Sequence, residues 1–170
     1  MSELISAIKA NKTIAIITPL ILISDLRIND DGTAPTDNPF YTSSGVSEQR
    51  KRIWAYGLRN PYSLDFHGDG KLFVNDVGNK SFEEINDVTL GGKNYGWPLI
   101  TYGIDYDNSI ISDKTEAPGM EQPVIYWKPS IAPCGMTFVT STKFKDWNGD
   151  LLVGSLKFQN IEHLVVKDNK

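Results

Sequence analysis

Short segments in which apolar and polar residues alternate recur along most of the chain. Three of them, Arg52–Tyr56, Tyr62–Phe66 and Leu72–Val74, are rich in aromatic and branched side chains, as β-strands are. The pair Asp69-Gly70 lies between the second and the third segment, and it predicts a two-residue hairpin turn in which both residues have a positive φ. The pattern therefore predicts antiparallel strands joined by tight turns.

The same pattern continues to the end of the chain without the helices of a βαβ alternation. Strands that are separated by turn signals about every eight to twelve residues are typical of an all-β protein. At about four strands and roughly 40–50 residues per blade, the pattern fits three to four blades of a β-propeller. The further strands that we expect are Leu26–Ile28, Pro123–Trp127, Gly135–Val139, Asp150–Gly154 and Ile161–Val166.

Residues 1–24 differ from the rest, and we assign the propeller domain to residues 25–170. Lys9 and Lys12 precede the apolar run Thr13–Ile23, an order that resembles a secretory signal. The run is short for a helix that crosses a bilayer. The alternative interpretation is a strand of an incomplete blade, or a non-native start.

Composition excludes several classes of function. The chain has 170 residues and a formal net charge of −4, which suits one globular domain and argues against a nucleic-acid surface. The single cysteine, Cys134, excludes an internal disulfide. The two histidines, His67 and His163, are far apart in the sequence, so a zinc site is not expected.

Polar residues gather at the predicted strand ends, where binding residues are usually placed in β-proteins. Arg59-Asn60-Pro61 forms a corner before one strand, and Glu83-Glu84 is an acidic pair at the end of another. We expect the corner and the pair to lie at the ends of adjacent antiparallel strands. The stretch closes with the aromatic, glycine-rich turn Gly91–Pro98.

Four motifs in this stretch carry a resemblance to a known family. They are Gly57–Pro61, Asp76–Gly78, Glu83–Asn86 and Gly92–Pro98, in that order and at matching spacing. Together they resemble the glucose/sorbosone dehydrogenase family, soluble quinoproteins that oxidise aldose sugars with pyrroloquinoline quinone (PQQ). The resemblance runs from about residue 26 to residue 166 and implies a six-bladed β-propeller, of which this chain would be a part.

The resemblance also implies an activity, which is PQQ- and calcium-dependent oxidation of aldose sugars to lactones. The expected partners are an aldose and an electron acceptor, and the expected location is periplasmic or secreted. By the same resemblance, the residues that contact or border PQQ are Arg59, Asn60, Tyr106, Trp127 and Lys157. For Tyr106 and Trp127, packing in the core is the alternative interpretation. For Arg59 the alternative is an arginine that pins the turn before Pro61, and for Lys157 a solvated lysine at a strand end.

Two calcium sites follow from the resemblance. Backbone carbonyls at Gly78 and Asn79 would hold the calcium that polarises PQQ, although the family usually has His-Gly-Pro where this chain has Val77-Gly78-Asn79. The carboxylate of Glu84 and the carbonyl of Tyr95 would hold a second, structural calcium. An ordinary turn and a solvated acidic pair are the respective alternatives.

The catalytic base of the family is absent from this chain. That base is a histidine located before the Arg-Asn-Pro corner, and no histidine precedes Arg59 here. We interpret His67 and His163 as structural or exposed, and we expect little or no activity from this chain alone. The alternative functions are a non-catalytic binding module like the hedgehog-interacting proteins of the same fold, or a bare structural fragment. Apolar blade faces left uncovered would favour self-association.

Overall fold

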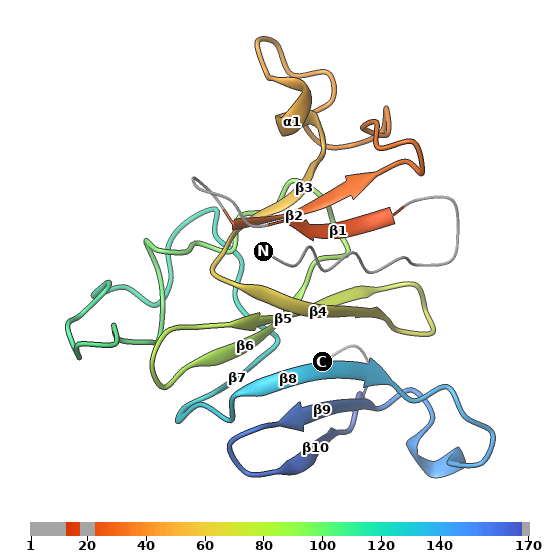
Figure 1. The fold of residues 1–170 in the computed structure, drawn as a ribbon, viewed down its shortest axis with the longest axis vertical. Helices are drawn as coiled ribbons and strands as arrows, with labels where there is room; N and C mark the ends of the chain where they lie inside the picture. The colour runs from red at the N-terminus through yellow and green to blue at the C-terminus, as the bar shows by residue number, and fades with distance from the viewer. Residues whose placement is uncertain (1–12, 18–22, 168–170) are drawn as a thin grey trace.

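The computed structural model describes residues 13–17 and 23–167, and this part of the chain is almost entirely β (Figure 1). Within these residues the chain forms ten strands, one short helix, α1 (Glu48–Lys51), and one 3-10 turn, η1 (Lys145–Trp147). None of the described helices is long and apolar enough to cross a membrane. The strands are β1 (Thr13–Ile17), β2 (Ile23–Ile28), β3 (Ile53–Leu58), β4 (Pro61–Phe66), β5 (Leu72–Val77), β6 (Glu83–Asp87), β7 (Ile125–Trp127), β8 (Pro133–Phe138), β9 (Leu151–Ser155) and β10 (Asn160–Leu164).

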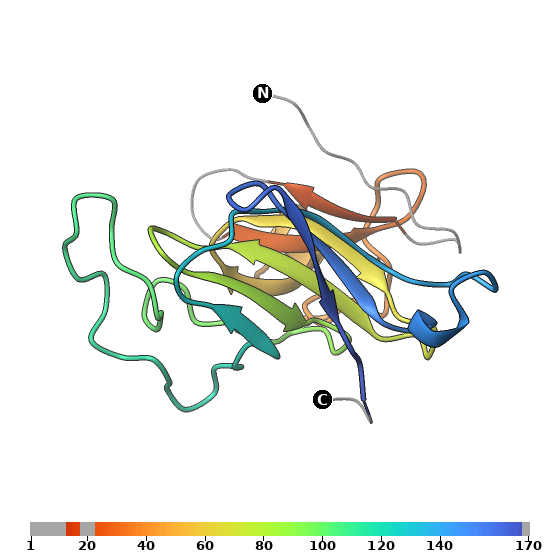
Figure 2. The same ribbon diagram turned by 90° about the horizontal axis from the view of Figure 1, so that it is seen from below.

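The strands form three antiparallel sheets, which follow one another along the long axis of the molecule (Figure 1). The first sheet has the order β1-β2-β3, the central sheet β4-β5-β6-β7, and the third sheet β10-β9-β8. β4 of the central sheet packs against β8 of the third, and a view from below shows the sheets overlapping with a long loop reaching out beside them (Figure 2). The all-β prediction is confirmed, and the described residues form three blades.

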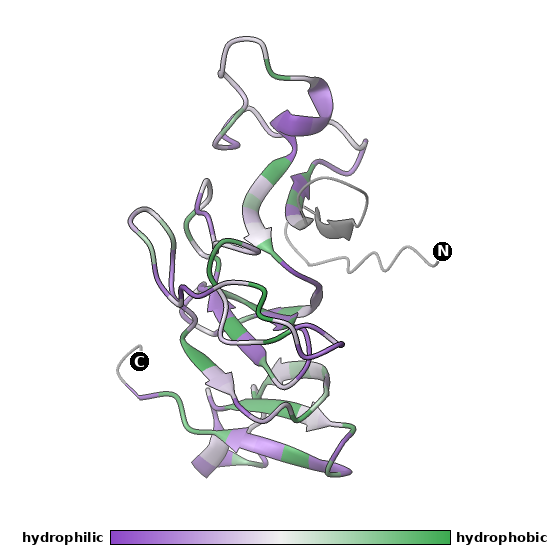
Figure 3. Ribbon diagram, turned by 90° about the vertical axis from the view of Figure 1, so that its left-hand side faces the viewer, coloured by the Kyte–Doolittle hydropathy of each residue, from purple (hydrophilic) through white to green (hydrophobic). Residues whose placement is uncertain are grey.

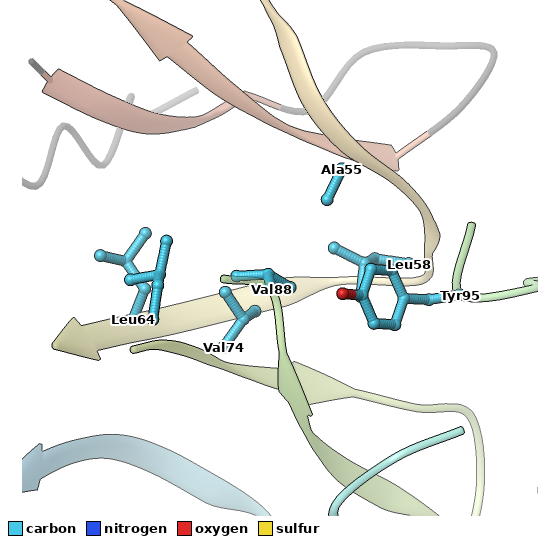
Figure 4. Packing of buried hydrophobic residues seen from close by; sticks show 7 residues of the cluster. Ala55, Leu58, Leu64, Val74, Val88 and Tyr95 are labelled. Carbon is cyan, nitrogen blue, oxygen red and sulfur yellow. The ribbon is translucent and has the colours of Figure 1, made fainter. Parts of the chain in front are cut away.

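The central sheet is covered on both faces, because its strands carry apolar residues on both sides. Figure 3 shows the hydrophobic and hydrophilic segments along the ribbon. Leu72 and Val74 of β5 pack with Ala55 and other residues of the first sheet (Figure 4). Phe73, between them in the sequence, packs in a second cluster with Phe138 and other residues of the third sheet. Successive side chains on a strand point to opposite faces, so one strand contributes to two cores.

Hydrogen bonds join the sheets at their buried faces. The indole Nε1 of Trp54 in the first sheet donates to the carbonyl oxygen of Val88, just after β6, at 2.7 Å. On the other side, Asp65 of β4 accepts from the backbone N–H of Phe138 at 2.8 Å and from the hydroxyl of Thr137 at 2.9 Å. These bonds link each sheet to the next at defined positions.

The hairpin between β4 and β5 differs from the prediction. Gly70 has a positive φ of 90°, but Asp69 does not. The N–H of Gly70 donates to the carbonyl of His67 at 2.9 Å, so the connection is a turn followed by a left-handed glycine, a common three-residue hairpin loop. The carboxylate of Asp69 explains the difference, because it accepts from the N–H of Lys71 at 3.1 Å and contacts His67 at 2.8 Å.

Part of the apolar run near the N-terminus is a strand of the first sheet. β1 pairs with β2, with Thr13 opposite Ile28. The basic lead that suggested a secretory signal, Lys9 and Lys12, lies outside the described residues.

One carboxylate is buried between the first and central sheets without a partner. Asp25 lies on β2 opposite Ala55, has no exposed surface, and neither of its carboxylate oxygens accepts a hydrogen bond. Burial, and then the negative charge of Asp76, raise the pKa of Asp25 to about 8. Asp25 is therefore protonated in the folded protein at neutral pH.

The buried Asp25 should make the protein less stable as the pH rises. Its pKa in the folded state is about 8 against an ordinary value of 3.8, so the folded state binds the proton more tightly. The stabilisation is complete below about pH 4 and is lost as the pH rises through about 8, with a slope of up to about 1.4 kcal/mol per pH unit between these values. Melting temperatures across this range should show the loss in the wild type and a flatter profile in Asp25→Asn. A matched variant at the exposed Asp30, Asp30→Asn, should behave as the wild type; equal slopes in all three proteins would contradict the assignment.

Candidate functional site

The Arg59-Asn60 corner, between β3 and β4, is held by a carboxylate from the neighbouring strand. Asp76 on β5 accepts from the backbone N–H of Arg59 at 2.8 Å and from that of Asn60 at 2.6 Å. The N–H of Val77 donates back to the carbonyl of Asn60 at 2.9 Å. Burial raises the pKa of Asp76 to about 6, and the two N–H donors oppose that rise. Asp76 is thus mostly ionised at neutral pH and fixes the backbone of the corner.

The guanidinium of Arg59 is oriented by neutral acceptors. Its Nη1 donates to the carbonyl of Val77 at 3.0 Å, and its Nη2 donates to the hydroxyl of Tyr106 at 3.3 Å. Its Cζ lies 5.8 Å from the centre of the Tyr106 ring, which is exposed. Among the described residues, no carboxylate forms a salt bridge with Arg59. Its charge is therefore held in place and available to an anionic ligand.

The turn after β5 brings Gly78 and Asn79 next to this corner. The N–H of Gly78 donates to the carboxylate of Glu83 at 2.9 Å. A Cβ at Gly78 would lie 2.2 Å from the carbonyl oxygen of Phe82, so only glycine fits. The side-chain Nδ2 of Asn79 donates to Asp105 at 3.1 Å, while its Oδ1 is buried and accepts no hydrogen bond.

Glu84 and Tyr95 lie together, as the sequence predicts. Both line a cavity of about 10 Å³, the size of one water or ion, together with Glu121. Glu84 pairs with Asp76 across the sheet and accepts from Asn86 at 3.1 Å. Burial, and then the charge of Asp76, raise the pKa of Glu84 to about 8. Like Asp25, Glu84 is therefore mostly protonated at neutral pH in the protein alone.

Two predicted cofactor residues lie on the side of the third sheet. The ammonium of Lys157 donates to the carbonyl of Ser130 at 3.0 Å and lies 5.3 Å from the centre of the Phe158 ring. Trp127 is half-buried and packs against the apolar cluster between the central and third sheets. This contact favours the core-packing interpretation for Trp127.

Sequence reasoning missed the buried carboxylates that hold these turns. Glu83 accepts from Gly78 through one oxygen and from the hydroxyl of Ser130, at 2.6 Å, through the other. Asp76 holds the Arg59 corner in the same way. For Asp76 the signal was present in the sequence as an acidic residue within a mostly apolar strand, whereas β6 around Glu83 is mostly polar and gave no such signal. The corner and the acidic pair also belong to strands separated by β5, rather than to adjacent strands.

The two histidines lie away from the corner. His67 follows β4 at the end opposite Arg59 and contacts Asp69 at 2.8 Å, while His163 contacts Asp150 at 2.7 Å. Both line a largely apolar cavity of about 290 Å³ between the central and third sheets. Across residues 13–17 and 23–167, no three His, Cys, Asp or Glu side chains form a group ready to hold a metal. A cation near Glu84 would therefore need backbone oxygens as further ligands.

Comparison with known proteins places this arrangement in a family. A family model described as Glucose / Sorbosone dehydrogenase matches residues 24–170. The chain belongs to the glucose/sorbosone dehydrogenase family. It is 42% identical over 148 residues to the aldose sugar dehydrogenase YliI of Escherichia coli, an alignment that covers 85% of this chain and 39% of that protein. It is also 45% identical over 75 residues to quinoprotein glucose dehydrogenase B of Acinetobacter calcoaceticus, across 44% of this chain and 14% of the relative.

The fold agrees with the family. The crystal structure of the soluble aldose sugar dehydrogenase from Escherichia coli in the apo-form superposes with a TM-score of 0.78 and 39% sequence identity. The superposition covers 86% of this chain and 42% of that one. The chain thus spans less than half of the length of these glucose/sorbosone dehydrogenase relatives, and its three sheets correspond to part of a β-propeller.

Removing the Asp76 carboxylate should free the backbone of the corner. In Asp76→Ala the amides of Arg59 and Asn60 lose bonds to a charged acceptor, each worth about 1.5–3 kcal/mol. Their hydrogen exchange, measured by NMR, should become about tenfold to a hundredfold faster. The amide of Val88, which donates to Leu72 at 2.8 Å away from the corner, is the control. Unchanged exchange at the corner, or equal acceleration at Val88, would contradict a local role.

Proposed function

We propose that the chain forms part of the PQQ and calcium site of an aldose sugar dehydrogenase, an oxidoreductase that converts aldoses to lactones. The observation that carries the proposal is the Arg59 guanidinium, which two neutral acceptors orient and which forms no salt bridge with a carboxylate of the described residues. PQQ has three carboxylates, which a fixed guanidinium can bind as a planar fork. The site residues remain proposals that follow the family resemblance.

The residues present suit PQQ. Arg59 and Lys157 would supply positive charge, Asn60 a polar amide, and Tyr106 an exposed aromatic face for a planar ring. Trp127 would pack behind the PQQ site, in the apolar cluster between the central and third sheets. When bound, PQQ supplies a two-electron oxidant for the anomeric carbon of the sugar. The protein residues would hold its orientation and stabilise negative charge on its oxygens.

The residues present also suit calcium, which prefers carboxylate and carbonyl oxygens. Gly78 and Asn79 would offer backbone carbonyls near Arg59, and the unpartnered Oδ1 of Asn79 leaves a further buried acceptor there. Glu84 and Tyr95 would hold a second ion in the small cavity that they share. A cation there would supply the positive charge that the buried Glu84 lacks.

The chain supplies no base at the position where the family has its histidine. His67 and His163 are each engaged with an aspartate at the other end of the sheets. We therefore propose that this chain binds the cofactor better than it turns over sugar. A periplasmic or secreted location and an external electron acceptor follow from the family resemblance alone.

Self-association is also part of the proposal. Two apolar side chains on and just after β10, Ile161 and Val165, are 66% and 55% exposed. Such apolar surface favours contact with a second copy or with further blades. Light scattering after size-exclusion chromatography should give a mass above the 19.0 kDa of one chain. A stable monomer with a cooperative melt would contradict this.

Loss of the Arg59 guanidinium should weaken PQQ binding. Arg59→Ala removes charge-assisted hydrogen bonds worth about 1.5–3 kcal/mol, a loss of roughly tenfold to more than a hundredfold in affinity. Fluorescence titration with PQQ in the presence of calcium measures this affinity. Arg59→Lys keeps the positive charge but lacks the planar guanidinium, so its affinity for PQQ should lie between those of the wild type and Arg59→Ala.

The matched control for this titration is Arg50→Ala, on the exposed helix α1 and outside the corner. It should bind PQQ as the wild type does. Equal affinities for Arg59→Ala and Arg50→Ala would remove Arg59 from the site, and a folded wild type that does not bind PQQ would overturn the proposed function.

A further inference from the structure

Glu83 connects two parts of the candidate site that belong to different sheets. It is the first residue of β6 and is 4% exposed. One carboxylate oxygen accepts from the N–H of Gly78, in the turn beside Arg59, at 2.9 Å. The other accepts from the hydroxyl of Ser130, in the corner between β7 and β8, at 2.6 Å. Each oxygen thus has a different partner on a different segment.

Ser130 continues the connection to the third sheet. Its hydroxyl oxygen accepts from the N–H of Ala132 at 3.0 Å, so it is engaged on both sides. Its carbonyl accepts from the ammonium of Lys157 at 3.0 Å. Three hydrogen bonds therefore connect Gly78 to Lys157. The N–H of Gly78 bonds to Glu83, the hydroxyl of Ser130 bonds to Glu83, and the carbonyl of Ser130 bonds to the ammonium of Lys157.

The corner that contains Ser130 has other anchors, which do not involve Glu83. The N–H groups of Leu156 and Lys157 donate to the carbonyls of Ala132 and Ile131 at 2.9 Å and 3.2 Å. The hydroxyl of Ser155 also donates to Ile131 at 2.8 Å. The backbone of the corner therefore stays on the third sheet when Glu83 is removed. Glu83 and the N–H of Ala132 together hold the hydroxyl of Ser130, so we expect the loss of Glu83 to loosen the Ser130 peptide and with it the Lys157 ammonium.

We propose that Glu83 is a positioning residue that sets the Lys157 ammonium of the third sheet relative to Gly78 and Arg59 of the central sheet. The anionic groups of a carboxylate-rich cofactor would then meet two cations at a fixed separation. The effect on cofactor binding rests on the proposed function, whereas the placement of Lys157 does not. The two are tested by separate readouts.

The first readout is the reactivity of the Lys157 amine, which needs no cofactor. Acetylation with a limiting amount of N-hydroxysuccinimide acetate is followed residue by residue by mass spectrometry, with the exposed Lys143 as the internal reference. An ammonium that donates to a carbonyl must leave it before its nitrogen reacts. Glu83→Ala should raise the rate at Lys157 relative to Lys143 by about two- to tenfold, the equivalent of one hydrogen bond.

Two further variants separate positioning from folding. Glu83→Gln keeps an acceptor for the N–H of Gly78 and gains a donor for the hydroxyl oxygen of Ser130, so Lys157 should react as in the wild type. Ser130→Ala leaves the contact between Glu83 and Gly78 in place and should free Lys157 as Glu83→Ala does. If Glu83→Ala fails to fold, Ser130→Ala still tests whether the contact between Glu83 and Ser130 restrains Lys157. Unchanged Lys157 reactivity in Ser130→Ala and in a folded Glu83→Ala would overturn the proposal.

The second readout is PQQ affinity in a double-mutant cycle. If Glu83 acts through Lys157, Lys157→Ala should weaken binding about tenfold in the wild type but less than about threefold in Glu83→Ala. If Glu83→Ala and Lys157→Ala weaken PQQ binding by independent factors that multiply in the double variant, the role of Glu83 in binding is overturned. If the wild type does not bind PQQ, the proposed function fails, while faster acetylation of Lys157 in Glu83→Ala would still establish its placement by Glu83.

Discussion

The central sheet is covered on both faces, so polar side chains on its strands are removed from water and are stabilised by hydrogen bonds within the protein. Asp76 faces the first sheet and accepts from two backbone N–H groups of the Arg59-Asn60 corner. Glu83 faces the other way and accepts from Gly78 and Ser130. Asp76 and Glu83 are buried with the central sheet, and their hydrogen bonds fix the two turns that contain the candidate site. The site is prearranged because the sheet is buried.

Two other buried carboxyl groups are less well satisfied by hydrogen bonds. Asp25 has no hydrogen-bond partner, and Glu84 has only the amide of Asn86. The pKa of each rises to about 8 because burial disfavours the charged form. Asp25 lies deep between two sheets, and a bound proton is enough to remove its buried charge. Glu84 lines a small cavity with Tyr95, and under the proposed function a bound cation would replace the proton there.

Much of this was predictable from the sequence. Alternating residues located β2 to β5 and β7 to β10, whereas β6, in which Ile85 is the single apolar residue, was not predicted. The ordered motifs located the family. The hairpin at Asp69-Gly70 was wrong in detail, because the Asp69 carboxylate binds its own loop and selects a longer turn. The role of Glu83 was not predictable, because its partner Ser130 is 47 residues away. Trp127 shows the same limit, since an aromatic residue in the core and one beside a cofactor have the same local pattern.

The most direct test of the account is a crystal structure of this chain grown with calcium and PQQ, with calcium located by its anomalous scattering. The account predicts one calcium within about 2.3–2.6 Å of carbonyl oxygens at Gly78 and Asn79, and a second beside the carboxylate of Glu84. PQQ should contact the Arg59 guanidinium. Ordered crystals at millimolar calcium that show neither ion, or PQQ bound away from Arg59, would contradict it.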